Sequence, residues 1–230
     1  MVVDNYNKIK EEVIQTAVKA GRNPEDVTLI AVSKTKPLAD IEELIRIGVV
    51  DFGENKVQEL CDKYENVSKP VRFHQIGHLQ TNKVKYVVDK AYMIHSLDSL
   101  KLAKEIEKEA AKKNVIAQVL IEVNVAEEDS KFGLKLQEVI PFLKEIKDFS
   151  HIHVNGLMTI APFVDDPEDN RKYFRALKQL SLDIICENID NIDMNVLSMG
   201  MTNDFKVAIE EGATMVRVGT AIFGQRNYNI

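Results

Sequence analysis

Cysteine, glycine and proline are all scarce in this chain of 230 residues. It contains 2 Cys, 10 Gly and 6 Pro, which excludes a disulfide-rich scaffold and a collagen-like or low-complexity chain. Cys61 and Cys186 stand alone in helix-like segments, and neither belongs to a CxxC motif or lies near a histidine at metal-ligand spacing. We therefore expect two buried thiols in a reducing compartment.

The chain also lacks an excess of positive charge and any long apolar run. Its 30 Lys and Arg against 36 Asp and Glu give a net charge of −6, so no overall attraction draws it to nucleic acid or to an anionic membrane. No apolar run approaches the ~18 residues that span a bilayer, and charged residues begin at Asp4. These features predict a soluble, cytoplasmic protein that acts on a small molecule.

What the chain does contain is a repeated pattern. Apolar residues at helical spacing over 6–20 predict an N-terminal helix that ends at Gly21. After it, a short apolar run followed by an amphipathic stretch occurs eight times, with no flexible linker. Such runs are typical of parallel strands covered by helices on both faces. The eight predicted strands are 27–33, 49–54, 71–76, 91–96, 115–125, 151–160, 194–199 and 214–219.

This pattern predicts an α/β fold, a single (β/α)8 TIM barrel with an extra N-terminal helix, over residues 1–230. The alternative is an open, doubly wound sheet. The first turn between strand and helix, SKTKP at 33–37, lacks the GxGxxG of a Rossmann fold, and eight regular units at this length favour the barrel. In a TIM barrel the active site lies at the C-terminal ends of the strands.

Lys34 is the first candidate at such a strand end. It follows the apolar residues 30–32, so its amine is expected at the mouth of an apolar barrel, where desolvation lowers the pKa of a lysine. A neutral amine is the nucleophile that forms a Schiff base. The alternative is a solvated lysine that begins a loop, but Pro37 restricts this loop.

The last two strand ends have the composition of phosphate-binding loops. Residues 198–203 (SMGMTN) supply the hydroxyl of Ser198, and 216–224 (VRVGTAIFG) supply Gly219 and Thr220 before a short helical tail. TIM barrels commonly bind phosphate at these two loops. Ordinary helix capping is the alternative for either loop alone. Together with an aldehyde-reactive lysine, the two loops indicate pyridoxal 5'-phosphate (PLP).

Arg217 lies two residues before the glycine of the last loop, so strand alternation directs its side chain to the same side. We expect it to face the pyridine nitrogen of PLP, where an arginine donates a hydrogen bond and discourages protonation of the ring. The alternative is a structural ion pair of Arg217 with Asp204, Glu210 or Glu211.

The histidines carry weaker signals. His151 and His153 share one strand face, but they open the sixth predicted strand, at the opposite end of the barrel, and no third ligand is in view. We therefore predict no metal site and interpret them as polar caps of the strand. His74 and His78 flank the exit of the third predicted strand, where either could contact a ligand or serve as a hydrogen-bonded structural histidine.

Six segments together resemble one known family, the pyridoxal phosphate homeostasis proteins (the YggS/PROSC family), which are similar to the barrel domain of alanine racemase. The resemblance covers nearly the whole chain and keeps the family's order. The segments are AVSKTKP (31–37), FGENKVQE (52–59), FHQIGHLQTNK (73–83), GLMTIAP (156–162), LSMGMTNDF (197–205) and VRVGTAIFG (216–224).

The resemblance implies a role for each matching residue. Lys34 is then the lysine that carries PLP as an aldimine, and Arg217 faces the pyridine nitrogen. Three departures flank the site: Phe73 and Gln75 stand where the family often has Trp and Phe, and Thr202 stands where Ser is common. The residues implied for the phosphate are Ser198, Gly219 and Thr220, and those implied to line the cofactor are Asn55, His74 and Met158.

Three functions remain open at this point. The first is a protein that holds PLP on a lysine and takes part in intracellular PLP (vitamin B6) homeostasis and amino-acid balance without turnover. It would exchange PLP with apo-enzymes as a monomer or weak dimer. The second is an amino-acid racemase, which needs a second base opposite Lys34, for example Tyr64 or Tyr228. The similar racemases take that base from a partner subunit with an additional domain. The third is a Schiff-base aldolase for sugar phosphates.

Overall fold

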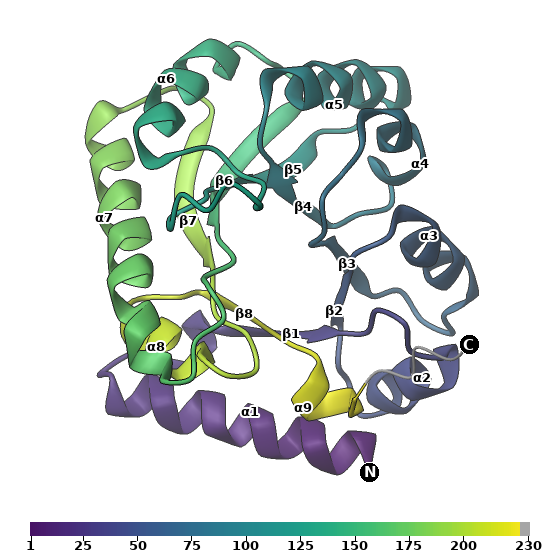
Figure 1. Ribbon diagram of the computed structural model, residues 1–230. Helices are drawn as coiled ribbons and strands as arrows, with labels where there is room; N and C mark the ends of the chain where they lie inside the picture. Colours follow the sequence, from purple (N-terminus) through teal and green to yellow (C-terminus); the bar gives the residue numbers. More distant parts are fainter. Residues whose placement is uncertain (226–230) are drawn as a thin grey trace.

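Eight parallel strands close into a barrel in the order in which they occur along the chain (Figure 1). The computed structural model describes residues 1–225. Pairing of the last strand with the first closes the sheet, and the predicted TIM barrel is confirmed. The strands are β1 (Thr28–Val32), β2 (Asp51–Glu54), β3 (Arg72–Gln75), β4 (Met93–Leu97), β5 (Ala117–Glu122), β6 (Ile152–Met158), β7 (Ile192–Ser198) and β8 (Met215–Val218).

Helices cover the outside of the barrel (Figure 1). The long helices bury one apolar face against the strands and expose the other, as their amphipathic sequences predict. Short 3-10 helices precede β1, α4 and α7. The outer helices are α2 (Leu38–Arg46), α3 (Val57–Asn66), α4 (Val84–Val87), α5 (Leu100–Lys113), α6 (Leu136–Ile146), α7 (Arg171–Glu187), α8 (Phe205–Glu210) and α9 (Thr220–Phe223).

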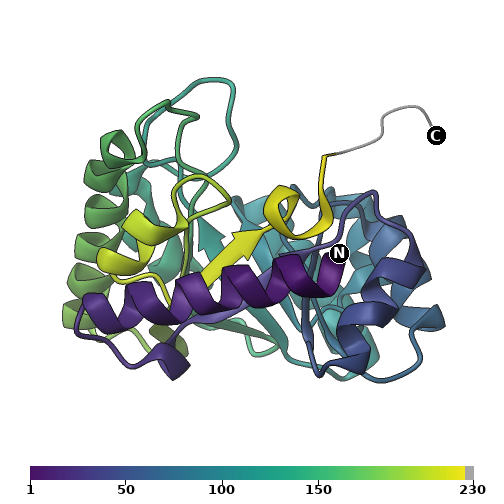
Figure 2. The ribbon, with the colours of Figure 1, turned by 90° about the horizontal axis from the view of Figure 1, so that it is seen from below.

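The extra N-terminal helix, α1 (Val2–Lys19), lies across the side of the barrel where α8 and α9 are short (Figure 2). It buries residues spaced three or four positions apart, among them Tyr6, Ile9 and Val13. The chain turns at Gly21, whose φ of 70° favours glycine. The predicted helix is confirmed, and it contacts both α8 and α9.

Apolar side chains fill two separate spaces. The larger space lies between the strands and the helices, where Phe52 and Phe73 are fully buried. The smaller space holds a cluster of Met93, Leu120 and Met158, which strand alternation places inside the barrel. Much of the remaining interior is polar, and these polar groups form the candidate site.

Seven of the eight strands are shorter than predicted, and β5 and β6 differ the most. The fifth predicted strand covers 115–125, but β5 ends at Glu122. The Nδ2 group of Asn124 donates to the carbonyl of Glu128 at 2.9 Å, and its Oδ1 accepts from the Glu128 amide at 3.2 Å. This turn takes the chain off the sheet. The sixth predicted strand covers 151–160, but β6 ends at Met158. The prediction was too long because an apolar run alone does not mark where a strand leaves the barrel.

The prediction of two buried thiols is wrong. Cys61 is half-buried, with its Sγ 3.3 Å from the carbonyl of Tyr86, and Cys186 is exposed. Cys186 lies in α7, whose buried face includes Leu180 and Ile184, and a helical position alone does not fix which side faces solvent. Within residues 1–225, no helix combines the length and the apolar character that a membrane span requires.

Candidate functional site

Lys34 lies two residues beyond the end of β1, at the C-terminal rim of the barrel. Lys34 lies in the turn that follows β1, and its side chain is half-buried. The following residue, Thr35, adopts a φ of 65°, which is unusual for a β-branched residue. Pro37 then leads into α2. We call residues 33–37 the lysine loop.

The lysine loop is tied to the end of the barrel sequence. The Nζ group of Lys36 donates to the carbonyl of Phe223 at 2.8 Å and to that of Gln225 at 2.9 Å. Both carbonyls lie at the C-terminal end of α9, where a cation is favourable. Lys36 therefore binds the C-terminal end of α9, whereas the side chain of Lys34 lies at the rim of the barrel.

A second set of contacts holds the lysine loop from outside the barrel. The Nζ group of Lys63 lies 2.7 Å from Glu54, 2.7 Å from Glu59 and 2.8 Å from the carbonyl of Ser33. Glu54 also accepts from the Ser33 hydroxyl, and Glu59 accepts from the amide of Thr35 at 2.6 Å. We call Ser33, Glu54, Glu59 and Lys63 the outer brace, because it fixes the residues on both sides of the candidate lysine.

The outer brace is buried except for Glu59, whose side chain is 21% exposed. The side chain of Lys63 is 8% exposed and that of Glu54 is not exposed at all. Burial raises the pKa of Glu54 to about 7, although Lys63 and the Ser33 hydroxyl favour its charged form. A buried ion pair of this kind depends on both partners, because either charge alone is costly in the interior.

Gly219 and Thr220 reach the same corner of the rim as the lysine loop. Ala31 of β1 pairs with Val218 of β8, so the two strands end side by side. A Cβ atom on Gly219 would lie 3.2 Å from the carbonyl oxygen and 3.3 Å from the Cβ of Val32, and the glycine permits this close approach. Thr220 is exposed and opens α9.

The neighbouring loop after β7 also depends on a glycine. Gly200 has a φ of 91°, and a Cβ atom there would lie 2.6 Å from that of Ala208. The loop is closed by a hydrogen bond of 2.7 Å from the Met201 amide to Asp204. Thr202 is half-buried in this turn. The two predicted phosphate loops thus lie after adjacent strands, which pair directly.

Arg217 is buried inside the barrel and is held by three hydrogen bonds. Its Nη1 group donates to the carbonyl of Ser198 at 2.7 Å and to the Ser198 hydroxyl at 2.6 Å. Its Nη2 group donates to the carbonyl of Thr159 at 2.7 Å. These bonds use three of the five N–H groups of a guanidinium and fix the plane of the side chain.

The ion pair considered for Arg217 is not formed. Glu210 and Glu211 instead bind Arg171, and Glu211 also binds Arg175. Asp204 accepts from the Met201 amide and from Asn170.

Burial lowers the pKa of Arg217 to about 10, with Glu122 and Asp204 acting against the shift. The guanidinium therefore stays charged at neutral pH.

The structure brings Ser198 into contact with Arg217, a contact that the sequence did not reveal. The Ser198 side chain is fully buried, and its hydroxyl contacts both Arg217 and the Nδ1 atom of His95, the latter at 3.0 Å. A hydroxyl has a single proton to donate. Direct contact of this hydroxyl with a phosphate stays a prediction, and it would require the contact with His95 to break.

The three residues expected to line the cofactor lie at different places. His74 is fully buried between Asp51 and the next strand. Met158 belongs to the apolar cluster inside the barrel. Asn55 follows β2 in the rim, and its carbonyl accepts from Gln75 at 2.9 Å. Asn55 therefore lies at the rim, whereas His74 and Met158 lie on the inner wall.

Sequence reasoning assigned no role to two buried groups of the interior, His95 and Glu122. Burial raises the pKa of Glu122 to about 7, Asp98 raises it further and Arg217 opposes. One carboxylate oxygen, Oε2, is buried without a hydrogen-bond partner among residues 1–225. A charged residue that ends an apolar strand was the available signal, since both residues lie at the end of such a run.

The remaining histidines are engaged elsewhere. His78 stacks on Phe132 with ring centroids 3.7 Å apart. His151 lies 2.9 Å from Glu107 and His153 lies 3.0 Å from Asp193, as expected of polar groups that cap the start of β6. Among residues 1–225, no group of three or more histidine, cysteine or acidic side chains is arranged to hold a metal ion.

The closed barrel of eight parallel strands has the fold of the alanine racemase barrels. The alanine racemase of Clostridium difficile 630 shares this fold with a TM-score of 0.74 at 15% identity, and the match covers 96% of this chain and 57% of that chain. PipY of Synechococcus elongatus PCC7942, solved with PLP bound, gives a TM-score of 0.85 at 27% identity, with 97% and 100% covered.

Sequence comparison identifies the family. The model of the alanine racemase N-terminal domain matches residues 5–227. The pyridoxal phosphate homeostasis protein of Aquifex aeolicus is 43% identical over 226 residues, which is 98% of each chain. That of Escherichia coli K12 is 34% identical over 233 residues, which is 99% of this chain and 98% of the relative. The chain belongs to the alanine racemase N-terminal domain family, among the pyridoxal phosphate homeostasis proteins.

Proposed function

We propose that this chain binds PLP covalently at Nζ of Lys34 and takes part in intracellular PLP homeostasis and amino-acid balance. Full-length relatives carry the name of that function, and PipY has been solved with PLP bound. The observation that carries the proposal is the convergence of Lys34, Gly219 and the buried Arg217 at the paired ends of β1 and β8. An amine, a close backbone approach and a cationic donor are what an aldehyde-bearing phosphate ester requires.

Each group has a separate task in this proposal. Lys34 supplies the amine, and the outer brace and Lys36 hold the lysine loop so that the amine stays at the rim. Gly219 and Thr220 bind the phosphate through backbone amides and a hydroxyl. Ser198 stands beside them as a further candidate. Arg217 faces the pyridine nitrogen with an N–H group that the protein does not use, and Asn55, His74 and Met158 line the ring.

We further propose that the bound cofactor is carried without turnover. PLP supplies an electron sink for carbanions, and it does so best with a protonated ring nitrogen. Arg217 keeps its charge at neutral pH, so a cation faces that nitrogen and discourages its protonation. Of the two tyrosines considered as a second base for racemisation, Tyr64 is exposed on the outer helix α3, and Tyr228 lies outside the described residues.

A spectrum of the purified protein tests PLP binding. We expect PLP to produce a visible absorption band in the wild type and in the exposed-lysine control Lys104→Ala, and no band in Lys34→Ala. The absence of a band in the wild type would contradict PLP binding and favour the third function, a Schiff-base aldolase that takes a sugar phosphate.

Exchange of the α-proton of alanine for solvent deuterium, followed by NMR, tests turnover. We expect little or no exchange with either enantiomer in the PLP-loaded protein, because a missing general base costs ~10²- to 10⁴-fold in rate. Fast exchange of both enantiomers that disappears in Lys34→Ala would establish a racemase.

The cellular context belongs to the same proposal. We propose that the protein acts in the cytoplasm as a monomer or weak dimer and exchanges PLP with apo-enzymes. Mixing the PLP-loaded protein with an apo-enzyme and following recovery of that enzyme's activity measures the exchange. A recovery no faster than with free PLP released into solution would contradict direct transfer.

A further inference from the structure

Inside the barrel, five polar side chains form one continuous series of hydrogen bonds, which we call the inner chain. Asp51 Oδ1 lies 3.1 Å from His74 Nε2, and His74 Nδ1 lies 2.9 Å from His95 Nε2. His95 Nδ1 lies 3.0 Å from Ser198 Oγ, which lies 2.6 Å from Nη1 of Arg217. The inner chain therefore crosses from β2 through β3, β4 and β7 to β8.

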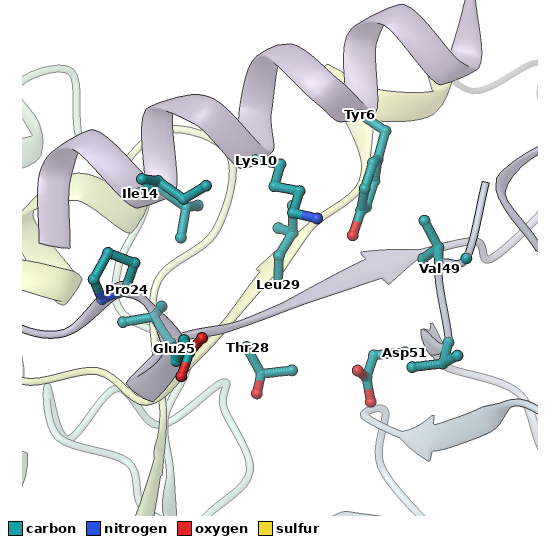
Figure 3. Close-up of a pocket in the computed structure, with 13 residues that line it drawn as sticks. Tyr6, Lys10, Ile14, Pro24, Glu25, Thr28, Leu29, Val49 and Asp51 are labelled. Atoms are coloured by element: carbon teal, nitrogen blue, oxygen red, sulfur yellow. The ribbon is translucent and has the colours of Figure 1, made fainter.

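The two ends of the inner chain lie at opposite faces of the barrel. Asp51 begins β2 and lines a groove of about 400 Å³ between α1 and the N-terminal ends of the strands, together with Tyr6 and Lys10 (Figure 3). Arg217 lies two residues before Gly219 at the C-terminal rim. The series thus connects the candidate cofactor site with the face that is farthest from it.

The direction of every hydrogen bond in the inner chain follows from the chemistry of its members. A charged Asp51 only accepts, so His74 donates to it from Nε2, and the Nδ1 atom of a neutral His74 accepts from Nε2 of His95. The Nδ1 atom of a neutral His95 then accepts the single proton of Ser198, whose oxygen accepts from Arg217, which only donates. This arrangement requires both rings to be neutral and protonated at Nε2.

The charges of these groups support that arrangement. Burial acts to raise the pKa of Asp51, but hydrogen bonds from His74 and Arg72 outweigh it and the net shift is downward. Burial lowers the pKa of His74, although Asp51 opposes. Burial lowers the pKa of His95 well below its usual value, and Arg217 adds to the effect. Asp51 therefore accepts as an anion while both histidines are neutral.

We propose that Asp51, His74 and His95 are positioning residues for Arg217, which they hold through the hydroxyl of Ser198. The proposal rests on the proposed function, in which Arg217 faces the ring of PLP. It assigns Ser198 a different task from the predicted one, because a proton given to His95 is not available to a phosphate. Ser198 then affects PLP binding through Arg217. A substitution of Asp51, at one face of the barrel, should change PLP binding at the opposite face.

Nitrogen NMR of the protein without PLP tests the inner chain directly. In protein labelled with ¹⁵N-histidine, we expect two rings to be neutral Nε2–H tautomers at neutral pH, and their signals are assigned by their loss in His74→Asn and His95→Gln. The Nη signals of Arg217 should show hindered rotation. A doubly protonated ring or an Nδ1–H tautomer at either position would overturn the proposal, whatever the outcome of PLP binding.

Two substitutions of one histidine separate positioning from packing. Gln at position 95 retains one acceptor and one donor, whereas Leu retains only the volume. We expect His95→Leu to free the rotation of the Arg217 guanidinium and to raise the Kd for PLP about tenfold or more. His95→Gln should stay within about threefold of the wild type. Equal effects of the two variants on PLP affinity and on the Arg217 signals would show that the histidine only fills space.

Substitutions inside the barrel could simply unfold the protein, so a variant at Asp51, the end of the inner chain away from the cofactor, provides an independent test. Asp51→Asn keeps an acceptor for His74 but removes the anion, and we expect a several-fold higher Kd for PLP and a shifted absorption band. Lys10→Met, in the same groove, is the matched control and should change neither. Unchanged PLP affinity and spectrum in Asp51→Asn would overturn the coupling. A wild type that binds no PLP would instead contradict the proposed function, while the NMR result still decides the inner chain.

Discussion

The inner chain and the outer brace are two largely buried polar clusters that both reach the C-terminal rim of the barrel, and they are built differently. The outer brace gathers two carboxylates and a carbonyl around one ammonium group, Lys63, so its members are held by charge. The inner chain separates its two charges, Asp51 and Arg217, by three neutral groups. Its order depends on the direction of hydrogen bonds. The lysine loop is thus held by the attraction of opposite charges, and the planar guanidinium of Arg217 is held by the orientation of its hydrogen bonds.

The largest expected effect comes from breaking the outer brace. Lys63→Met leaves Glu54 and Glu59 without their cation, and removing one partner of a buried pair costs about 3 to 5 kcal/mol of unfolding free energy. We also expect slower covalent attachment of PLP, because the lysine loop loses its support. Chemical denaturation and stopped-flow absorbance measure the two effects.

The comparison needs a control at a surface pair. Lys90 lies 3.6 Å from the exposed Glu65, and Lys90→Met should cost less than about 1 kcal/mol. Similar losses for Lys63→Met and Lys90→Met would mean that the outer brace does not act as a buried ion pair.

The next effect comes from breaking the inner chain at its cationic end. Ser198→Ala removes the hydrogen bond to the charged Arg217, and a bond of this kind is worth about 1.5 to 3 kcal/mol. We expect weaker PLP binding, because Arg217 is then no longer held in place. The loss should be accompanied by free rotation of the Arg217 guanidinium, as seen by ¹⁵N NMR without PLP. A weaker affinity for PLP with unchanged Arg217 signals would instead indicate that the Ser198 hydroxyl binds the phosphate directly.

A pH titration sharpens the comparison through a third buried group, Glu122. Its pKa is raised to about 7 in the folded protein, so the folded state binds more protons than the unfolded state between about pH 4.5 and 7. Through Glu122 the wild type should lose stability as pH rises through this window, by about 3 kcal/mol. Glu122→Gln should lack the part due to Glu122, whereas the part due to Glu54, whose pKa is also raised to about 7, should be the same in both proteins. Parallel pH profiles of thermal unfolding for the two proteins would contradict the raised pKa.

The smallest effect is expected at a residue outside both clusters. Thr220 is exposed at the start of α9, so Thr220→Val should weaken PLP binding by about 1.5 kcal/mol through one lost hydrogen bond. Backbone amides should retain the rest of the phosphate affinity. Unchanged PLP dissociation in the double variant Ser198→Ala/Thr220→Val would show that the phosphate does not bind at these two loops.

Much of the fold could be predicted from the sequence, because each strand and helix leaves a local pattern. The eight apolar runs identified the strands, and the rule that barrel sites lie at strand ends selected Lys34, Gly219 and Arg217. Strand ends were less certain, since the turn at Asn124 depends on side-chain hydrogen bonds to Glu128 that periodicity does not reveal.

The two clusters could not be predicted, because they depend on contacts across the barrel. His95 and Ser198 are 103 positions apart in the chain and meet only when the sheet closes. The sequence alone therefore assigned Ser198 to the phosphate and His74 to the cofactor without showing their partners across the barrel, and both assignments stay predictions. The available signal was a polar residue inside an apolar run, as at Asp51, His74 and His95.

The central claim, that Lys34 carries the cofactor, has one direct test. The protein is loaded with PLP, reduced with borohydride and digested, and the modified peptide is identified by mass spectrometry. We predict that the label lies on the peptide that contains Lys34, in one equivalent per chain. A label on Lys36, Lys83 or a surface lysine, with Lys34 unmodified, would contradict the assignment of the site.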